Sequence, residues 1–173
     1  MTKLTFCRYS LLSLISLIVF AANADSQDEK LKAIFIYNFT KYVNWPAKGG
    51  NFIITVLGSS EITNELKGIA AKKQVGNSAI EIKSTASPAD IAQCHILYIT
   101  AAKTNTLPQL LNYIKNNKIL VITEKPNSCQ SGSGINFVTK EGKLAFEISK
   151  GNIENCGLNV SSELLTMGTV VVN

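Results

Sequence analysis

Residues 94–123 read CHILYITAAKTNTLPQLLNYIKNNKILVIT, and this stretch decides the fold. It begins and ends with apolar runs, 94–100 and 118–123, that have the length and composition of buried strands. Residues 106–116 between them carry apolar side chains at helical spacing, namely Leu107, Leu110, Leu111 and Ile114. A strand, a helix and a second strand in this order indicate a parallel pair of strands with a helix on one face.

The same alternation continues on both sides of this unit. Upstream, we expect strands over residues 52–57 and 79–83, a helix over 61–71 and a short helical or turn segment over 88–93. Downstream, we expect a loop over 127–134, followed by strands over 135–139 and 143–148 that a tight turn joins. A short helix over 152–156, extended chain over 157–160 and a helical turn over 161–165 should follow. Residues 169–172 should form an edge strand or a frayed tail. The predicted fold is therefore an α/β single-domain sandwich: a mostly parallel central sheet with helices on both faces and a C-terminal antiparallel hairpin.

The segment before the first strand predicts a long helix over residues 29–44. It has no glycine or proline before Pro46, and its apolar side chains cover two adjacent faces, so the helix should be largely buried. Asp28 or Ser26 can cap its start. Trp45 precedes Pro46 and is therefore disfavoured in the α region, which ends the helix.

The first 24 residues have the pattern of a secretory signal peptide. A short positive segment with Lys3 and Arg8 precedes an apolar run over residues 11–22, and Ala22-Asn23-Ala24 offers small residues for cleavage. The apolar run is shorter than the ~20 residues of a membrane-spanning helix, although a retained N-terminal anchor is the alternative. Cleavage would leave residues 25–173 as one secreted domain.

The charge of the secreted domain argues against nucleic-acid binding. Loss of Lys3 and Arg8 leaves 15 basic and 12 acidic residues, so the net charge falls from +5 to +3. No arginine remains, and arginine is the residue on which bidentate recognition of phosphates and guanines normally depends.

Three cysteines remain in the secreted domain: Cys94, Cys129 and Cys156. Cys94 lies in an apolar strand, where a buried thiol is the ordinary expectation. Cys129 and Cys156 lie in polar segments near the end of the domain, and in an oxidising compartment we predict that they form a disulfide. Its loop of about 28 residues would stabilise the fold by around 3 kcal/mol in the chain-entropy model. No metal site is expected, because the sequence has no C-x-x-C or H-x-x-x-H spacing.

The sequence shows no recognisable set of catalytic residues. The stretch Ser131-Gly132-Ser133-Gly134 lacks the third glycine of a dinucleotide site and the lysine of a P-loop. His95, the one histidine, is flanked by apolar residues and is expected to pack in the core. Glu147 lies between apolar neighbours in a strand. Its carboxylate could be a solvated surface group or a contact with a partner, and the sequence leaves both interpretations open. The pattern favours a binding or regulatory protein over an enzyme, and no cofactor is expected.

Several blocks, in order along the secreted domain, resemble the YfiR family of periplasmic regulators. They are residues 32–46 (KAIFIYNFTKYVNWP), 94–99 (CHILYI), 119–124 (ILVITE) with 134–137 (GINF), and 146–148 (FEI) with 157–165 (GLNVSSELL). Each block is short, but together with the signal peptide they cover nearly the whole domain in the family's order.

The resemblance implies a function that composition alone does not show. Proteins of this family repress an inner-membrane diguanylate cyclase through its periplasmic sensor domain, and an outer-membrane OmpA-like lipoprotein sequesters the repressor. Cyclic di-GMP and biofilm formation are thereby controlled. The family is not catalytic and has an α/β sandwich fold. Its members are often dimeric, so the resemblance implies that this protein could form a homodimer. It also uses disulfides, but three cysteines allow one intramolecular bridge only.

By position, the family's partner-facing C-terminal region falls on Glu147 and Ile153. An exposed Ile153 beside a charged Glu147 would suit an interface with an apolar anchor and a polar rim, whereas an Ile153 that covers the sheet is the alternative. The N-terminal segment carries five aromatic residues: Phe35, Tyr37, Phe39, Tyr42 and Trp45. We expect them to pack in the core; the alternative is that they line a groove that receives a segment of a partner protein. A periplasmic small-molecule sensor is the alternative function.

Overall fold

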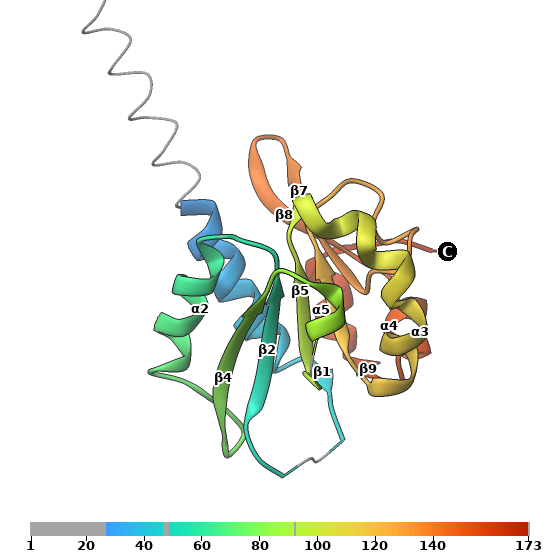
Figure 1. Ribbon diagram of the computed structural model, residues 1–173. Coiled ribbons are helices and arrows are strands. Elements are labelled where there is room, and N and C mark those ends of the chain that lie inside the picture. Colours follow the sequence, from blue (N-terminus) through green and yellow to red (C-terminus); the bar gives the residue numbers. More distant parts are fainter. Residues whose placement is uncertain (1–26, 47–48, 92, 173) are drawn as a thin grey trace, which may run out of the picture.

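The computed structural model describes residues 27–46, 49–91 and 93–172, and its main feature is a curled eight-stranded sheet (Figure 1). The strands of this sheet are β2 (Phe52–Leu57), β3 (Gln74–Val75), β4 (Ser78–Thr85), β5 (Ile96–Ile99), β6 (Leu120–Thr123), β7 (Ile135–Lys140), β8 (Lys143–Ile148) and β10 (Thr169–Val170). Their order across the sheet is β10-β8-β7-β6-β5-β2-β4-β3.

The sheet is mostly parallel, as the sequence predicts. Strands β7, β6, β5, β2 and β4 run parallel to one another, whereas β8 pairs with β7 as an antiparallel hairpin. The edge strand β10 lies parallel to β8, and β3 lies antiparallel to β4 at the other edge. Strand β3 was not expected from the sequence. It forms because Gly76, at φ 57°, permits a tight turn between Val75 and Ser78.

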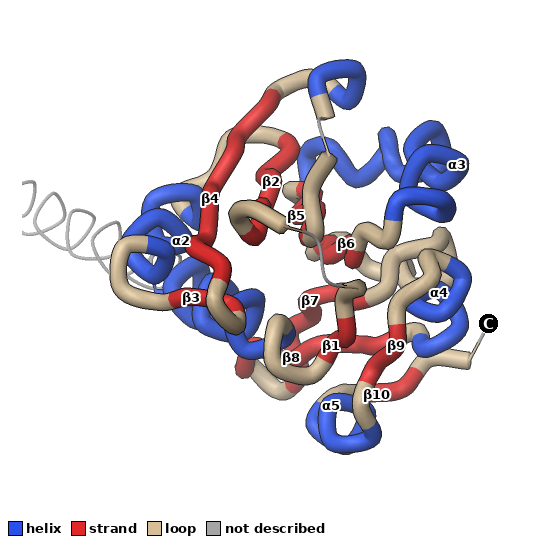
Figure 2. The backbone as a smooth tube through the Cα atoms, turned by 90° about the horizontal axis from the view of Figure 1, so that it is seen from below, coloured by secondary structure: helices blue, strands red, loops and turns tan. Residues whose placement is uncertain are grey.

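Two short strands outside this sheet join distant parts of the chain. Strand β1 (Val43–Asn44) pairs antiparallel with β9 (Asn159–Val160), and Figure 2 shows the two side by side. The Ser161 backbone N–H donates to the Tyr42 carbonyl oxygen at 2.8 Å and extends this pairing. The segment that follows the N-terminal helix is thereby tied to the C-terminal part of the domain.

Helices and helical turns cover the two faces of the sheet. They are the N-terminal helix (described residues 27–39), α2 (Ile62–Ala70), α3 (Leu107–Asn117), α4 (Lys150–Asn155), α5 (Ser162–Met167) and the 3-10 turns η1 (Pro88–Asp90) and η2 (Ala101–Thr106). Serine side chains cap α4 and α5, because Ser149 Oγ accepts from the Asn152 N–H and Ser161 Oγ accepts from the Leu164 N–H.

Alternating side chains of the central strands form two hydrophobic cores, one on each face of the sheet. On one face, Ile96 and Tyr98 of β5 pack in a core with the N-terminal helix, α2, α4 and α5. On the other, Leu97 and Ile99 pack in a core with α3 and the loop before β5. Period-two alternation places successive residues on opposite faces, so each central strand must be apolar throughout. The predicted sandwich with helices on both faces is confirmed.

The prediction of a helix over residues 29–44 is wrong at its C-terminal end. Helical residues end at Phe39, and Thr40 to Tyr42 form a turn of tighter i to i+3 bonds. Thr40 Oγ1 donates to the Tyr37 carbonyl oxygen at 2.6 Å, which replaces continued helical bonding there. Val43 then pairs with Val160, because a β-branched residue suits a strand better than a helix end.

The predicted signal peptide, residues 1–24, and Ser26, one of the two expected helix caps, lie outside the described residues. Within residues 27–46, 49–91 and 93–172, no helix has the length and apolar composition needed to cross a membrane.

Candidate functional site

A groove of about 540 Å³ lies between the N-terminal helix, the carboxyl end of β6 and the β7–β8 hairpin. Its charged lining residues are Asp28, Lys32, Glu124, Lys140 and Glu147, and Phe137 and Leu144 are among its apolar ones. We call it the hairpin groove. It contains Glu147, one of the two residues that the sequence places at a partner site.

A buried amide holds the Glu147 carboxylate in position. Asn136 lies opposite Glu147 in the hairpin register, and its Nδ2 donates to Glu147 Oε2 at 3.1 Å. Asn136 is fully buried, so a fixed donor lies behind a half-buried carboxylate. The Asn136 Oδ1 in turn accepts from Thr123 Oγ1 at 2.9 Å, and Thr123 Oγ1 lies 2.9 Å from Ser133 Oγ. The carboxylate is therefore preorganised by a polar chain that continues into the core.

A second carboxylate of the groove, Glu124, joins the N-terminal helix to the sheet. Its Oε2 accepts from Lys32 Nζ and from the Tyr98 hydroxyl, both at 2.7 Å, and its Oε1 accepts from the Ala101 N–H at 2.8 Å. Lys32 Nζ also lies 2.7 Å from Glu29 Oε1. The network is partly buried, so its charged hydrogen bonds are stronger than those of a surface pair.

The electrostatics of this network keep both ends charged. Burial by itself would raise the Glu124 pKa, but hydrogen bonds from Lys32, Tyr98 and Ala101 outweigh it and hold the pKa below its usual value. Burial would lower the Lys32 pKa, but the bonds to Glu124 and Glu29 raise it. Burial, followed by the Glu124 charge, raises the Tyr98 pKa, so this phenol stays a proton donor. Lys32 and Tyr98 are therefore hydrogen-bond donors to a permanently ionised Glu124 at neutral pH.

Ile153, the other residue assigned to a partner site, is not exposed. Its side chain is 1% exposed and belongs to the core with Leu120. A Cβ on Gly134 would lie 2.9 Å from Ile153 Cγ1, so the absence of a side chain at Gly134 makes the room that Ile153 fills. The expectation of an exposed apolar anchor is wrong, and the alternative, an Ile153 that covers the sheet, is correct. The partner role of Glu147 stays a prediction.

All three cysteines of the described chain are buried, and Cys129 and Cys156 are not joined by a disulfide in this structure. Cys156 packs in the core beneath α3, in the same cluster as Cys94. Burial raises the pKa of the Cys129 thiol to about 12 and also raises that of Cys156. Both thiols are therefore buried although the segments that carry them are polar in sequence, and only Cys156 belongs to a hydrophobic core. The oxidised pairing stays a prediction.

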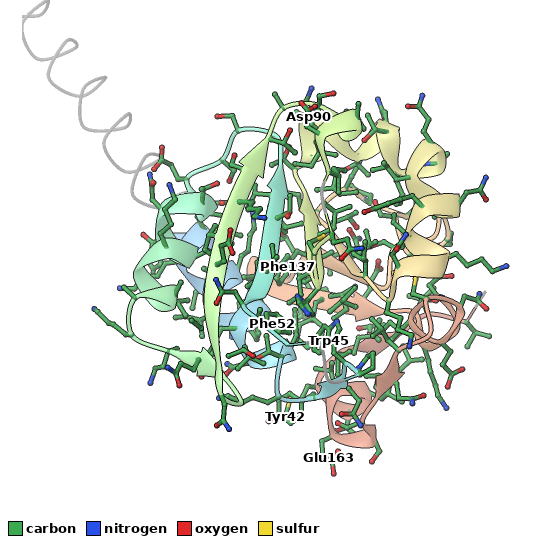
Figure 3. The ribbon with its side chains drawn as sticks, turned by 60° about the horizontal axis from the view of Figure 1, so that its bottom comes forward. Tyr42, Trp45, Phe52, Asp90, Phe137 and Glu163 are labelled. Atoms are coloured by element: carbon green, nitrogen blue, oxygen red, sulfur yellow. The ribbon has the colours of Figure 1, made fainter. Side chains whose placement is uncertain are left out.

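His95 packs against neighbouring side chains as expected, but it is half-buried rather than enclosed in the core. Its ring stacks on Phe52 with centroids 4.5 Å apart, and its Nδ1 accepts from the Ile53 N–H at 3.0 Å. Trp45 completes the cluster: it meets Phe52 edge-on and its Nε1 donates to the His95 carbonyl oxygen at 3.2 Å. Figure 3 shows Trp45 beside Phe52 at the start of β2.

The N-terminal aromatic residues divide between core and surface. Phe39 is 1% exposed and stacks among Phe35, Phe137 and Phe146, so it forms core as expected. Tyr37 instead lines a surface groove between the N-terminal helix and α2.

Sequence reasoning missed Asn136, Thr123 and Lys32 as parts of the site. A signal for two of them was present, because a polar residue inside an apolar strand needs a hydrogen-bond partner when it is buried. Lys32 carried no such signal, since its partner Glu124 lies 92 positions away along the chain.

Comparison with known proteins agrees with the resemblance seen in the sequence. A family model described as YfiR/HmsC-like matches residues 29–169. The match includes the N-terminal helix, the sheet and both sides of the hairpin groove. No curated protein matches the chain.

Proposed function

The chain belongs to the YfiR/HmsC-like family, and on this premise we propose that it represses a membrane diguanylate cyclase by binding the periplasmic sensor domain of that cyclase. The family consists of periplasmic regulators rather than enzymes. Repression would lower cyclic di-GMP and thereby restrain biofilm formation.

The observation that carries this proposal, beside the family, is the geometry of the hairpin groove. Glu147 presents a half-buried carboxylate whose position is set by the buried Asn136 amide. Leu144, which is partly exposed, adds apolar surface to the lining of the same groove. A charged group next to an apolar recess is the arrangement on which a partner's basic and apolar side chains anchor together.

Such a repressor works by differential affinity. It must bind the inactive conformation of the sensor domain more tightly than the active one, because equal affinity for both shifts no equilibrium. Moving a sensor from mostly active to mostly inactive requires a preference of up to about 10⁴-fold. An outer-membrane OmpA-like lipoprotein that binds the repressor would relieve repression by lowering its free concentration.

The test is the cellular level of cyclic di-GMP in a deletion strain. Restoring the secreted protein should reverse a rise seen on deletion, and restoring Glu147→Gln should reverse it less completely. The amide keeps the size of the side chain and removes its charge, so the fold should survive. Glu154→Gln is the matched control, because Glu154 is exposed on α4 outside the groove. No change of cyclic di-GMP on deletion would refute the repressor function, whereas equal restoration by both variants would refute only the role of Glu147.

A small-molecule sensor is the second candidate, and the size of the hairpin groove favours it. About 540 Å³ lies within the ~300–1,000 Å³ range of small-ligand sites. A ligand that raises the melting temperature of the purified protein with its concentration, and less so for Glu147→Gln, would support this function instead.

A further inference from the structure

A second groove, on the other flank of the N-terminal helix, is the strongest remaining feature of the surface. It has a volume of about 590 Å³ and lies between the N-terminal helix and α2, which Figure 1 shows side by side in blue and green. The N-terminal helix and its turn line it with Lys30, Ile34, Tyr37, Asn38 and Lys41, and the α2 segment lines it with Glu65, Gly68, Ile69, Lys72 and Lys73. We call it the lysine groove.

The lysine groove is strongly positive. Four lysines, Lys30, Lys41, Lys72 and Lys73, line it against one acid, Glu65, which gives a local charge of +3. Residues 25–173 also have a net charge of +3, so the rest of the domain is neutral on balance. Concentration of the net charge at one concave site attracts and orients a negatively charged partner.

The floor of this groove is apolar and partly exposed. Ile34 is 40% exposed, and the partly buried Ile69 of α2 lines the groove with it. Tyr37 is held over the groove, because its hydroxyl donates to the Gln74 carbonyl oxygen at 3.5 Å and Lys41 Nζ lies 5.0 Å from its ring centroid. Apolar surface between two rows of lysines suits a ligand that is itself amphipathic.

Gly68 leaves the α2 wall of the lysine groove open. It lies within the helix, where glycine is less favourable than alanine by roughly 0.5–1 kcal/mol. A Cβ built at Gly68 meets nothing within 4 Å, so packing inside this domain does not require a glycine. Because Gly68 has no side chain, the backbone of a bound partner helix has room to approach α2 at this position.

We propose that the lysine groove binds an acidic amphipathic helix of a partner protein. The N-terminal helix from Lys30 to its end at Phe39 covers about two and a half turns, or about 14 Å, which is enough for apolar anchors at i, i+4 and i+7 of a partner helix. Glutamates and aspartates on both sides of those anchors would pair with the lysines. This inference goes beyond the proposed function. The lysine groove and the hairpin groove share no lining residue, so variants of one leave the lining of the other unchanged.

The experiment uses the protein purified from the periplasm and a labelled amphipathic peptide of about 18 residues, with leucines at i, i+4 and i+7 and glutamates flanking them. Binding is followed by fluorescence anisotropy. Lys72→Glu with Lys73→Glu reverses two charges of the groove. The matched control is Lys67→Glu with Lys115→Glu, because both lysines are exposed on helices and neither lines the groove.

A second pair of variants tests the shape of the groove separately from its charge. Gly68→Leu fills the groove with a side chain that the helix tolerates. Gly151→Leu is the control, since Gly151 lies in α4 and a Cβ there also meets nothing within 4 Å. Circular dichroism should show that all four variants are folded.

We expect the acidic peptide to bind and its lysine-containing counterpart not to bind. The groove double variant and Gly68→Leu should each weaken binding by about tenfold or more, and the two controls by much less. Absence of binding, or equal losses in groove and control variants, would overturn the proposal. It would also be overturned if vesicles with anionic phosphatidylglycerol bind the protein in preference to the peptide, or if the groove variants abolish a dimer seen by light scattering. None of these outcomes changes the cyclic di-GMP test, so the two proposals fail independently.

Discussion

Replacing Ile153 with alanine should destabilise the fold rather than remove a surface contact. The side chain is 1% exposed and lies against Leu120 in the core that joins α4 to the sheet. Gly134 approaches so closely that even a Cβ there would lie 2.9 Å from Ile153 Cγ1. The neighbouring backbone cannot easily collapse into the space that alanine would leave.

The magnitude follows from the buried atoms. Isoleucine to alanine removes three buried carbons, at about 0.8 kcal/mol each, and the residual cavity adds a further term, so the loss is about 3–4 kcal/mol. For a domain of about 150 residues this corresponds to a fall in melting temperature of about 10 °C. Ile153→Val removes one carbon and should lower the free energy of unfolding by about 1 kcal/mol.

Urea denaturation of the purified domain, followed by circular dichroism, measures these differences. Glu147→Gln is the comparison, because its half-buried side chain should leave the midpoint nearly unchanged. An Ile153→Ala protein as stable as the wild type would refute the buried position. So would a variant of normal stability that had lost binding to a partner.

Other consequences of the structure are equally accessible to measurement. Burial would raise the Glu124 pKa, but the hydrogen bonds from Lys32, Tyr98 and Ala101 hold it below its usual value in the folded protein. The stabilisation from this carboxylate is therefore present above the unfolded pKa and is lost as the pH falls through the folded pKa. Lys32→Met should therefore lower the free energy of unfolding at pH 7. Below about pH 5, the free energy of unfolding of this variant should decrease less steeply with falling pH than that of the wild type. Gly134→Ala should destabilise the domain by about 1–3 kcal/mol, because the added methyl overlaps Ile153. Burial raises the pKa of the Cys129 thiol to about 12, so in the reduced protein its alkylation at pH 8 should be slow when the protein is folded and fast in urea.

Controls distinguish these explanations from general loss of structure. Lys115→Met changes an exposed lysine, so the dependence of the free energy of unfolding on pH below about pH 5 should stay as in the wild type. Gly151→Ala adds a methyl where nothing lies within 4 Å and should not destabilise. Mass spectrometry of the protein alkylated before reduction tests the predicted Cys129–Cys156 bridge. Rapid modification of the native Cys129 thiol would contradict its burial.

Much of the fold was predictable because the local pattern and the tertiary structure agree. The apolar strands at 94–100 and 118–123 and the helix between them lie where expected, with bounds shifted by one or two residues. The error at residues 40–44 has a different origin. Those residues have acceptable helical composition, but Val43 gains a strand partner, Val160, that lies far away in the chain. No local pattern reports such a partner.

The site was less predictable than the fold. Glu147 was found because a carboxylate inside an apolar strand is unusual, and the structure places it in a groove. Ile153 was misassigned because an isoleucine on a short polar helix has the same composition whether it faces the sheet or solvent. Lys32 and Glu124 were separate charges in the sequence, and only folding brings their atoms to 2.7 Å.

The sequence by itself determined the class of the fold and the family, since both depend on short-range periodicity and on blocks of consecutive residues. It also determined the charge of the domain. Only the tertiary structure decided which charges lie together, that Ile153 is buried, and that the N-terminal helix has one groove with three carboxylates and another with four lysines. The physical reason is that burial and electrostatic pairing depend on contacts between residues far apart in the chain, which the topology of the sheet creates.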